Sequence, residues 1–582
     1  MRVTTSKSKN AESFYINHAY IDENGKSTSR IYKKLGTLKE LSEKLGTDRD
    51  GVMAWAREQA RIATEEYKKE NEAISVSLFP NRILDKDQDR TFNCGYLFLQ
   101  SIYYHLRLDK VCRNIRRRHD YQYDMNAILS DLIFARILDP SSKLSTYKYC
   151  QSLLERPGYE LHDLYRALSV LSQESDYIQA ELYRNSNFLH KRNTQILYYD
   201  CTNYYFEIEQ EDAFRKYGKS KEHRPNPIIE MGLFMDADGF PLAFDLFQGN
   251  LNEQKTLKGL EQKILDNFDC AQFVYCSDAG LGSKSNRVLN AMQGRSYVIT
   301  QSLKKLKKEI REQALDPTGY RKIGSRHFID LRKLDTKNKE VYDSIYYKEI
   351  PLETKDLDEI LVVTYSPKYA DYQRKIRQSQ IDRAMRMINE NGKIKKNRKN
   401  PNDPARFLKK MSCTEQGEIA SEEYCVLDKE AIDKEAMYDG FYAVVTSLVN
   451  EDIDTILFIN KRRWQIEECF RIMKTDFDAR PVHLQREDRI RAHFLICFMA
   501  LLFYRVLDSK LKGHYSAGEL ISTIKDMKMT LLEGYGYIPA YTRNDITDDL
   551  HETFGFRTDH QIIQKKKMRS IIHKTKDVKT LL

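Results

Sequence analysis

The chain has 582 residues, of which 41% are hydrophobic and 31% are charged, and its formal net charge is +10. This length allows several domains and at least one large hydrophobic core. The N-terminal sequence MRVTTSKSKN lacks the apolar segment of a signal peptide, and no apolar run reaches the roughly 18 residues of a membrane span. We therefore expect a cytoplasmic protein that does not enter a membrane.

Cysteine spacing and charge distribution further limit the class of protein to which the chain can belong. The ten cysteines are scattered without a CxxC pair, which disfavours a disulfide framework and a structural zinc site. Lysine and arginine gather between Asn391 and Lys410 and again from Gln561 to the C-terminus. Such clusters suit a polyanion, but a solvated loop explains each of them equally well.

The N-terminal third begins with a predicted hairpin and continues as helices. Residues 13–32 are expected to pair across a turn at Asn24-Gly25. Thr37 and Glu40 form a capping box before a short helix, and a longer helix is expected from 47 to about 73. We assign residues 1–90 to an N-terminal region that is a candidate for DNA binding.

The following residues, 91–194, are predicted to be a mainly helical region. Their hydrophobic residues recur with a helical period. A helix-turn-helix within them is neither favoured nor excluded.

From Gln195 the pattern changes to strands. Residues 196–200 (ILYYD) are predicted to be a buried strand that ends in Asp200. Two strands joined through Asp238-Gly239 follow, then a strand before Asp278 and another at 296–300. This mixture of hairpin and alternating strands and helices predicts an α/β core with a mixed sheet.

The alternation stops after Thr300 and resumes near 440. We therefore predict an inserted, β-rich domain, followed by a strand, one long helix (452–477) and a buried apolar helix (489–507). The expected division of this part is core 195–303, insertion 304–440, core 441–505 and a basic helical C-terminal region 506–582.

Three carboxylates in these elements are candidates for chemistry. Asp200 and Asp278 each follow a buried strand, and ligands gather at strand ends in open α/β sheets. On the long helix, Ile466, Phe470 and Met473 make an apolar stripe. A second stripe beside it is charged and consists of Arg463, Glu467, Arg471 and Lys474.

Such carboxylates can hold two Mg²⁺ ions, which bind carboxylate, water and phosphate oxygens. Two ions clamp the attacking and leaving oxygens of an in-line phosphoryl displacement. Arg471 and Lys474 would then face the phosphodiester. Each element alone has an ordinary explanation, since a strand-end Asp is often a turn residue and a Glu four residues from an Arg is often a surface pair.

Four spaced segments, in order, carry a family resemblance: YYDCTNYYFE, KEHRPNPIIEMGLFMDADGFPLAFDLFQGN, SDAGLGS and RRWQIEECFRIMK, with RILDPSSKL upstream. Over residues 130–505 the chain resembles insertion-sequence transposases of the IS4 group, most closely the IS1634-like branch. Its helix fits the signature Y-x2-R-x3-E-x6-K through Arg463, Glu467 and Lys474. The tyrosine position holds Asn460 instead.

The resemblance implies a ribonuclease-H-like mixed-sheet catalytic core and a DDE triad of Asp200, Asp278 and Glu467, which would ligate two Mg²⁺ ions or Mn²⁺ in their place. It implies DNA contacts by Arg463, Arg471 and Lys474. The expected partners are double-stranded DNA, as terminal repeats and as target, and a second copy of the chain in the DNA complex. The expected location is the bacterial cytoplasm, with the nucleoid.

Two other functions remain open. One is a metal-dependent DNA nuclease without strand transfer, and the other is a non-catalytic DNA-binding protein derived from a transposase. Several neighbouring residues also admit two interpretations. Thr202 and Asn203 are turn caps or supports for the metal ligands, Trp464 stacks on a base or lies in the core, and His493 is expected in the core.

Overall fold

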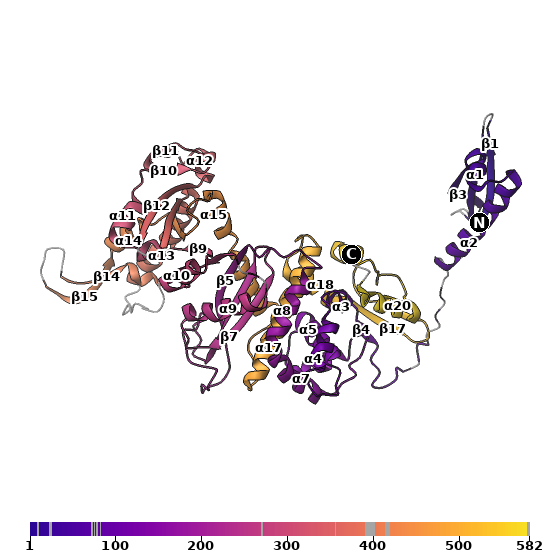
Figure 1. Cartoon of the computed structure of the whole chain (residues 1–582), viewed down its shortest axis with the longest axis horizontal. Coiled ribbons are helices and arrows are strands. Elements are labelled where there is room, and N and C mark those ends of the chain that lie inside the picture. Colours follow the sequence, from indigo (N-terminus) through magenta and orange to yellow (C-terminus); the bar gives the residue numbers. More distant parts are fainter. Residues whose placement is uncertain are drawn as a thin grey trace. The chain divides into compact units, whose positions relative to one another are not determined.

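The computed structural model describes the whole chain except residues 9–10, 22–25, 71–73, 75, 77–78, 82, 269, 271, 355–356, 390–401, 414–418 and 579–582. It separates into two compact units, Met1–Gln88 and Asp89–Leu582 (Figure 1). Each unit has a hydrophobic core of its own.

The N-terminal unit is a three-stranded antiparallel sheet followed by two helices. Its strands are β1 (Arg2–Lys7), β2 (Glu12–Ile21) and β3 (Ser27–Thr37), and its helices are α1 (Leu38–Leu45) and α2 (Arg49–Glu70). The predicted capping box is present, because Thr37 accepts from the Glu40 N–H and the Glu40 carboxylate accepts from Thr37. The predicted turn at Asn24-Gly25 lies outside the described residues.

The larger unit is built on one ten-stranded mixed sheet, and this confirms the predicted α/β class. The strand order is β11 (Phe328–Ile329), β10 (Tyr320–Lys322), β12 (Tyr346–Thr354), β13 (Leu357–Tyr365), β16 (Phe441–Thr446), β9 (Ser296–Thr300), β8 (Val274–Ser277), β5 (Ile196–Tyr205), β6 (Ile228–Asp236), β7 (Pro241–Gln248). Strand β8 runs parallel to β5 and β9. The other neighbours pair antiparallel.

The strands of the segment 304–440 extend this central sheet. Strand β13 pairs with β16, and β16 pairs with β9, so four strands of the segment continue the same hydrogen-bonded surface (Figure 1). Only β14 (Leu408–Cys413) and β15 (Ile419–Leu427) form a separate hairpin among the described strands of this segment. Its helices are α11 (Lys308–Leu315), α12 (Lys339–Asp343), α13 (Pro367–Asn389) and α14 (Lys429–Ala436).

Helices cover the two faces of the central sheet. On one face, Tyr199 and Tyr275 pack with α9 (Thr256–Asn267), near α10 (Lys284–Met292). On the other face, Tyr198 and Tyr204 pack with α15 (Ile453–Lys461), α16 (Trp464–Thr475) and α17 (Glu487–Lys510). Alternation of side chains along β5 decides which residues meet which helices.

Helix α17 is the centre of the larger core, as its apolar sequence predicts. It is long and apolar enough to cross a membrane by length and composition, but 94% of its apolar window is buried inside the protein. It packs on α3 (Tyr96–His105), α5 (Met125–Leu138) and α7 (Leu161–Gln173) of the predicted helical region. That region also contains α4 (Leu108–Arg116), α6 (Lys143–Cys150) and α8 (Ser175–Ser186).

The C-terminal segment returns to this helical core. Strands β17 (Lys528–Leu532) and β18 (Gly536–Pro539) form a small sheet with β4 (Thr91–Asn93). Helices α18 (Ala517–Asp526), α19 (Asp545–Phe554) and α20 (Lys565–Thr575) complete it. Met568 and Ile571 of α20 are buried, so the basic C-terminal region is part of the fold as well as a source of charge.

Candidate active site

Asp200 lies in the middle of a strand, and the prediction that its strand ends there was wrong. Strand β5 continues to Tyr205 because β6 pairs with it along its whole length. The parallel partner β8, in contrast, ends at Ser277. Asp200 is therefore two residues beyond the last paired residue of β5 with β8, Tyr198. The sheet edge near which Asp200 lies is therefore the carboxyl end of β8.

The parallel register brings the two aspartates together. Ile196, Leu197 and Tyr198 pair with Val274, Tyr275 and Cys276. Continuing the same register by two residues places Asp278 opposite Asp200. Residues opposite each other in neighbouring strands project from the same face, and the charge of Asp278 does act on Asp200.

Burial leaves Asp200 with a poorly stabilised charge. Removal from water, the largest influence, raises its pKa to about 6, and the charge of Asp278 acts in the same direction. Lys221 and Arg463 oppose this rise, as does a hydrogen bond of 2.8 Å from the Cys201 N–H. Two adjacent carboxylates repel each other, and a bound cation relieves both the repulsion and the desolvation.

Asp278 is oriented by the loop that follows it. One carboxylate oxygen accepts hydrogen bonds from the N–H groups of Gly280, at 2.8 Å, and Leu281, at 3.2 Å. A side chain at Gly280 would approach that same oxygen within 3.1 Å. The small residue therefore leaves the carboxylate accessible while the backbone holds its direction.

The predicted long helix is two helices, α15 and α16, which meet at Arg462–Arg463. At this junction hydrogen bonds span three residues, from Gln465 to Arg462 and from Ile466 to Arg463. The apolar stripe of α16 packs as predicted, because Ile466, Phe470 and Met473 are buried.

The charged stripe of α16 divides into inward and outward residues. Arg463 and Lys474 are mostly buried, with side chains 21% and 14% exposed, whereas those of Glu467 and Arg471 are 55% and 52% exposed. Arg463 binds the Glu467 carboxylate at 2.9 Å. Burial opposes the effect, but Glu467, Tyr442, Asp200 and Asp278 together raise the pKa of Arg463. The charges of all three predicted acids therefore act on this one guanidinium.

Lys474 reaches the same face of β5 as Asp200. Its ammonium donates to Thr202 Oγ1 at 2.8 Å and to Glu222 at 3.2 Å. Burial lowers the pKa of Lys474 to about 8, and nearby Lys221 contributes. Arg471 points elsewhere, to Glu468 and Asp476.

Residues of the loop before β6 and of β6 itself, which the sequence did not single out, complete the surroundings. Lys221 donates to the Cys201 carbonyl and pairs with Glu253 at 2.9 Å. Glu230 is buried, and burial raises its pKa to about 8. The alternating charges of the segment KSKEHRPNP were the available signal, but the spacing did not indicate which of them fold inward.

The hydroxyl of Tyr442, on strand β16, contacts Asn460 at the tyrosine position of the signature. Asn460 donates from Nδ2 to the Tyr442 hydroxyl at 3.0 Å, and the same hydroxyl lies 2.7 Å from Thr300 Oγ1. Tyr442 belongs to β16 and acts electrostatically on Arg463. A phenol hydroxyl is therefore present beside the asparagine that replaces the tyrosine of the signature.

The remaining candidate residues lie in different environments. His493 is a core residue as predicted, 5% exposed and bonded to the Ala479 carbonyl. Trp464 is 53% exposed, which contradicts a core position. Glu468, the neighbour of Glu467, pairs with Arg505 at 3.0 Å.

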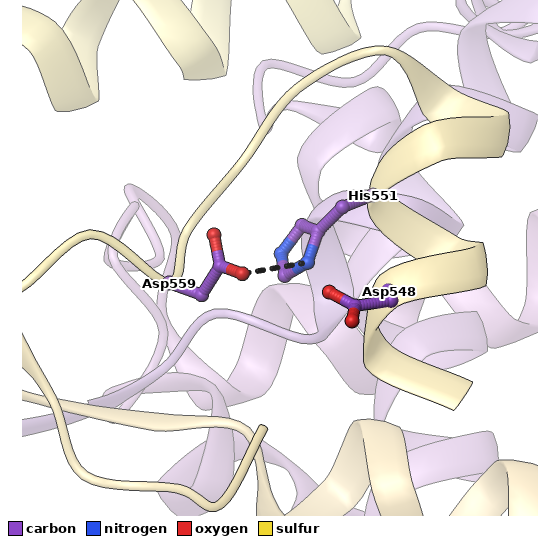
Figure 2. Close-up of side chains that lie close together, drawn as sticks. All are labelled: Asp548, His551 and Asp559. Atoms are coloured by element: carbon purple, nitrogen blue, oxygen red, sulfur yellow. Dashed lines mark ion pairs between the residues drawn. The ribbon is translucent and has the colours of Figure 1, made fainter. Parts of the chain in front are cut away.

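The compact trio of metal-type ligands among the described residues lies elsewhere. Asp548, His551 and Asp559 offer ligand atoms within 4.8 Å of one another, whereas the carboxylate oxygens of the three predicted acids are not all so close together. Figure 2 shows the first two on α19 and Asp559 on the loop that follows. Arg557 binds Asp548 at 2.7 Å and Asp559 at 2.5 Å. Arg543 pairs with the same two carboxylates, at 2.8 Å and 3.6 Å, so two guanidinium groups balance two acids and the cluster is an ion-pair network.

Comparison with known proteins places the chain in a family. The model described as "Transposase DDE domain" matches residues 191–503, which contain Asp200, Asp278 and Glu467. The chain therefore belongs to the DDE transposase family, and it is an enzyme of the nuclease and transposition type that binds DNA. Transposases of this family generally use divalent metal ions.

The other comparisons add little detail. No curated protein matches the chain. Among solved structures, the chain is similar to a piggyBac transposase in a synaptic complex with hairpin DNA, at 9% identity and a TM-score of 0.33. That alignment covers 83% of this chain and 84% of the other.

Proposed function

We propose that this protein is an insertion-sequence transposase of the IS4 group, IS1634-like branch, with a ribonuclease-H-like core and the triad Asp200, Asp278 and Glu467. The observation that carries the proposal is the shared register of Asp200 and Asp278 on the sheet face that α16 covers. This face brings two acids from neighbouring strands under a helix that offers the third.

The carboxylate set fits Mg²⁺, or Mn²⁺ in its place, because hard cations prefer such oxygen ligands. A pair of these ions supplies charge stabilisation for the attacking and leaving oxygens of phosphodiester cleavage. Asp200 and Asp278 would hold the cations, and the Gly280 and Leu281 N–H groups fix the orientation of the Asp278 carboxylate. Glu467, which pairs with Arg463 in this structure, would be the third ligand.

The surrounding cations suit a DNA strand at this site. Arg463 and Lys474 are positioned to hold phosphates beside the acids, and Arg471 is exposed for contact further along the backbone. A cavity of about 440 Å³ adjoins Asp278 through Ala279, and Tyr369, Tyr372 and Lys304 line it. The partners are element ends and target DNA, bound by two copies of the chain in the nucleoid-bearing cytoplasm.

Strand transfer tests the proposed function. A duplex that carries the DNA flanking the gene, with free 3′-hydroxyl ends, is incubated with the full chain, Mg²⁺ and a supercoiled target. We expect joined products that require Mg²⁺ or Mn²⁺ and disappear in Asp278→Ala. Cleavage without joining would instead identify a nuclease, and binding without cleavage would identify a non-catalytic DNA-binding protein.

Helix α20 offers a test of DNA binding that leaves the fold intact. Lys565, Lys566, Lys567 and Arg569 are exposed, whereas the apolar side of the helix is buried. Replacing the three lysines with glutamine should weaken binding to unrelated duplexes. The slope of log K against log salt should fall by about 0.9 for each DNA phosphate that the variant no longer neutralises.

Filter binding across a salt series measures this slope. Replacing three exposed lysines of the segment 304–440 (Lys333, Lys337 and Lys339) gives a variant of equal charge for comparison. If the salt dependence of DNA binding is unchanged in the α20 variant, its three lysines do not contact DNA and are only solvated.

A further inference from the structure

A second cavity, whose lining contains none of the three predicted acids, is lined by basic residues. It has a volume of about 290 Å³ and lies where the segment Arg136–Lys143 meets the segment Asp478–Leu484. The basic residues that line it are Arg136, Lys143, Arg480, His483 and His493. One carboxylate, the exposed Asp478, is also in the lining.

Two of these basic side chains are buried, and no carboxylate of the described residues pairs with them. Arg136 is 3% exposed and Lys143 is 4% exposed. Arg136 donates to the carbonyl oxygens of Phe477 and Ser141, both at 3.1 Å, and its Nε has no partner among the described residues. Burial, with Arg136 acting in the same direction, lowers the pKa of Lys143 to about 7. Buried charges in proteins are normally paired, so this arrangement requires an explanation.

Further donors converge on the same space. The Ser141 hydroxyl and the Nε of Arg480 are buried and have no hydrogen-bond partner among the described residues. Helix α6 begins at Lys143 with Ser142 as its N-cap, so the positive end of the helix dipole adds to the field here. Removal from water is the main reason that the pKa of His493 lies well below its usual value, and Arg136 and Lys143 act in the same direction.

We propose that this cavity is a binding site for a phosphate-type oxyanion, held by Arg136, Lys143 and Arg480 with the Ser141 hydroxyl. Such a ligand supplies the negative charge that the buried cations lack and accepts from the unpartnered donors. None of these residues belongs to the proposed triad.

Arg480 connects the cavity to the candidate active site. Its guanidinium also binds Glu222, and the other oxygen of Glu222 accepts from Lys474, which binds Thr202 on β5. An oxyanion in the cavity competes with Glu222 for Arg480. Binding of an oxyanion in the cavity therefore changes the contacts of Lys474 with Thr202, two residues from Asp200.

The test uses the full chain, inorganic phosphate as the probe, and thermal unfolding at matched ionic strength in chloride. Phosphate should raise the unfolding temperature in a saturable manner. Lys143→Met should raise the unfolding temperature in chloride, because it removes a buried amine that has no carboxylate partner among the described residues, and should reduce phosphate affinity about tenfold or more. Ser141→Ala, which deletes one hydroxyl, should weaken phosphate binding without affecting folding.

Lys148→Met on the same helix is the matched control, because Lys148 is exposed. It should leave the phosphate response unchanged. A wild-type protein without a saturable response would overturn the proposal. So would a response that persists equally in Lys143→Met and Ser141→Ala.

A competition arm identifies the source of the phosphate group. If the natural occupant is a backbone phosphate, inorganic phosphate should displace labelled duplex DNA from the wild type more readily than from Lys143→Met. If it is a small free anion, phosphate should bind with equal affinity when DNA is present. Either result retains the oxyanion site and assigns its ligand.

Discussion

Replacing Asp200 with asparagine is expected to reduce DNA cleavage by at least about a thousandfold, since charge stabilisation by a bound metal is worth several kcal/mol. The same substitution should make the metal-free protein more stable. Asparagine has nearly the same shape but no charge, so it removes a metal ligand and a buried anion together. DNA binding should be largely retained, because Lys474 and Arg463 remain in place.

The stability change follows from the titration of Asp200. Burial is the main reason that its pKa rises from 3.8 to about 6 in the folded protein. The folded state therefore binds this proton more tightly than the unfolded state. The resulting stabilisation is complete below about pH 4 and is lost as the pH rises through about 6. At pH 8 the ionised group costs about 1–3 kcal/mol, which the asparagine variant avoids.

Unfolding of both proteins at pH 5 and pH 8, with and without Mg²⁺, separates these effects. The variant should gain most at pH 8, and Mg²⁺ should stabilise the wild type only. Asp454→Asn, at an exposed acid of α15, should change neither cleavage nor the response to Mg²⁺. Normal cleavage by the Asp200 variant would remove Asp200 from the active site.

Arg192→Met is expected to destabilise the larger unit by about 3–5 kcal/mol, because it leaves a buried carboxylate without its partner. The side chains of Arg192 and Asp236 are 1% and 0% exposed and form an ion pair. Arg192 also donates to Ser186 Oγ at 2.8 Å and to the Pro241 carbonyl at 3.0 Å. These bonds join the end of the helical region to the hairpin of β6 and β7.

Urea unfolding of the larger unit measures this cost. Arg184→Ala, which removes an exposed pair with Glu181, should cost less than about 1 kcal/mol. Adding Asp236→Asn to Arg192→Met should recover part of the loss, because the unpaired charge disappears. Equal effects of the two arginine substitutions would contradict a structural role for the buried pair.

The sequence by itself determined the local elements and the chemical groups of the site. The Thr37 capping box, the hairpin through Asp238-Gly239 and the buried helix α17 were all predicted, because each depends on residues close together in the chain. The apolar stripe of α16 was predicted for the same reason. The two aspartates were identified from the apolar strands before them.

Only the tertiary structure decided which distant residues meet. Strand β5 extends past Asp200 because β6 pairs with it, and strands of the segment 304–440 join the central sheet because β13 pairs with β16. The basic cavity unites Arg136 and Arg480, which lie far apart in the chain. Non-local pairing is selected by the packing of the whole core, whose free energy no short stretch of sequence contains. Local patterns therefore name the charged groups, and packing alone decides which of them are buried together.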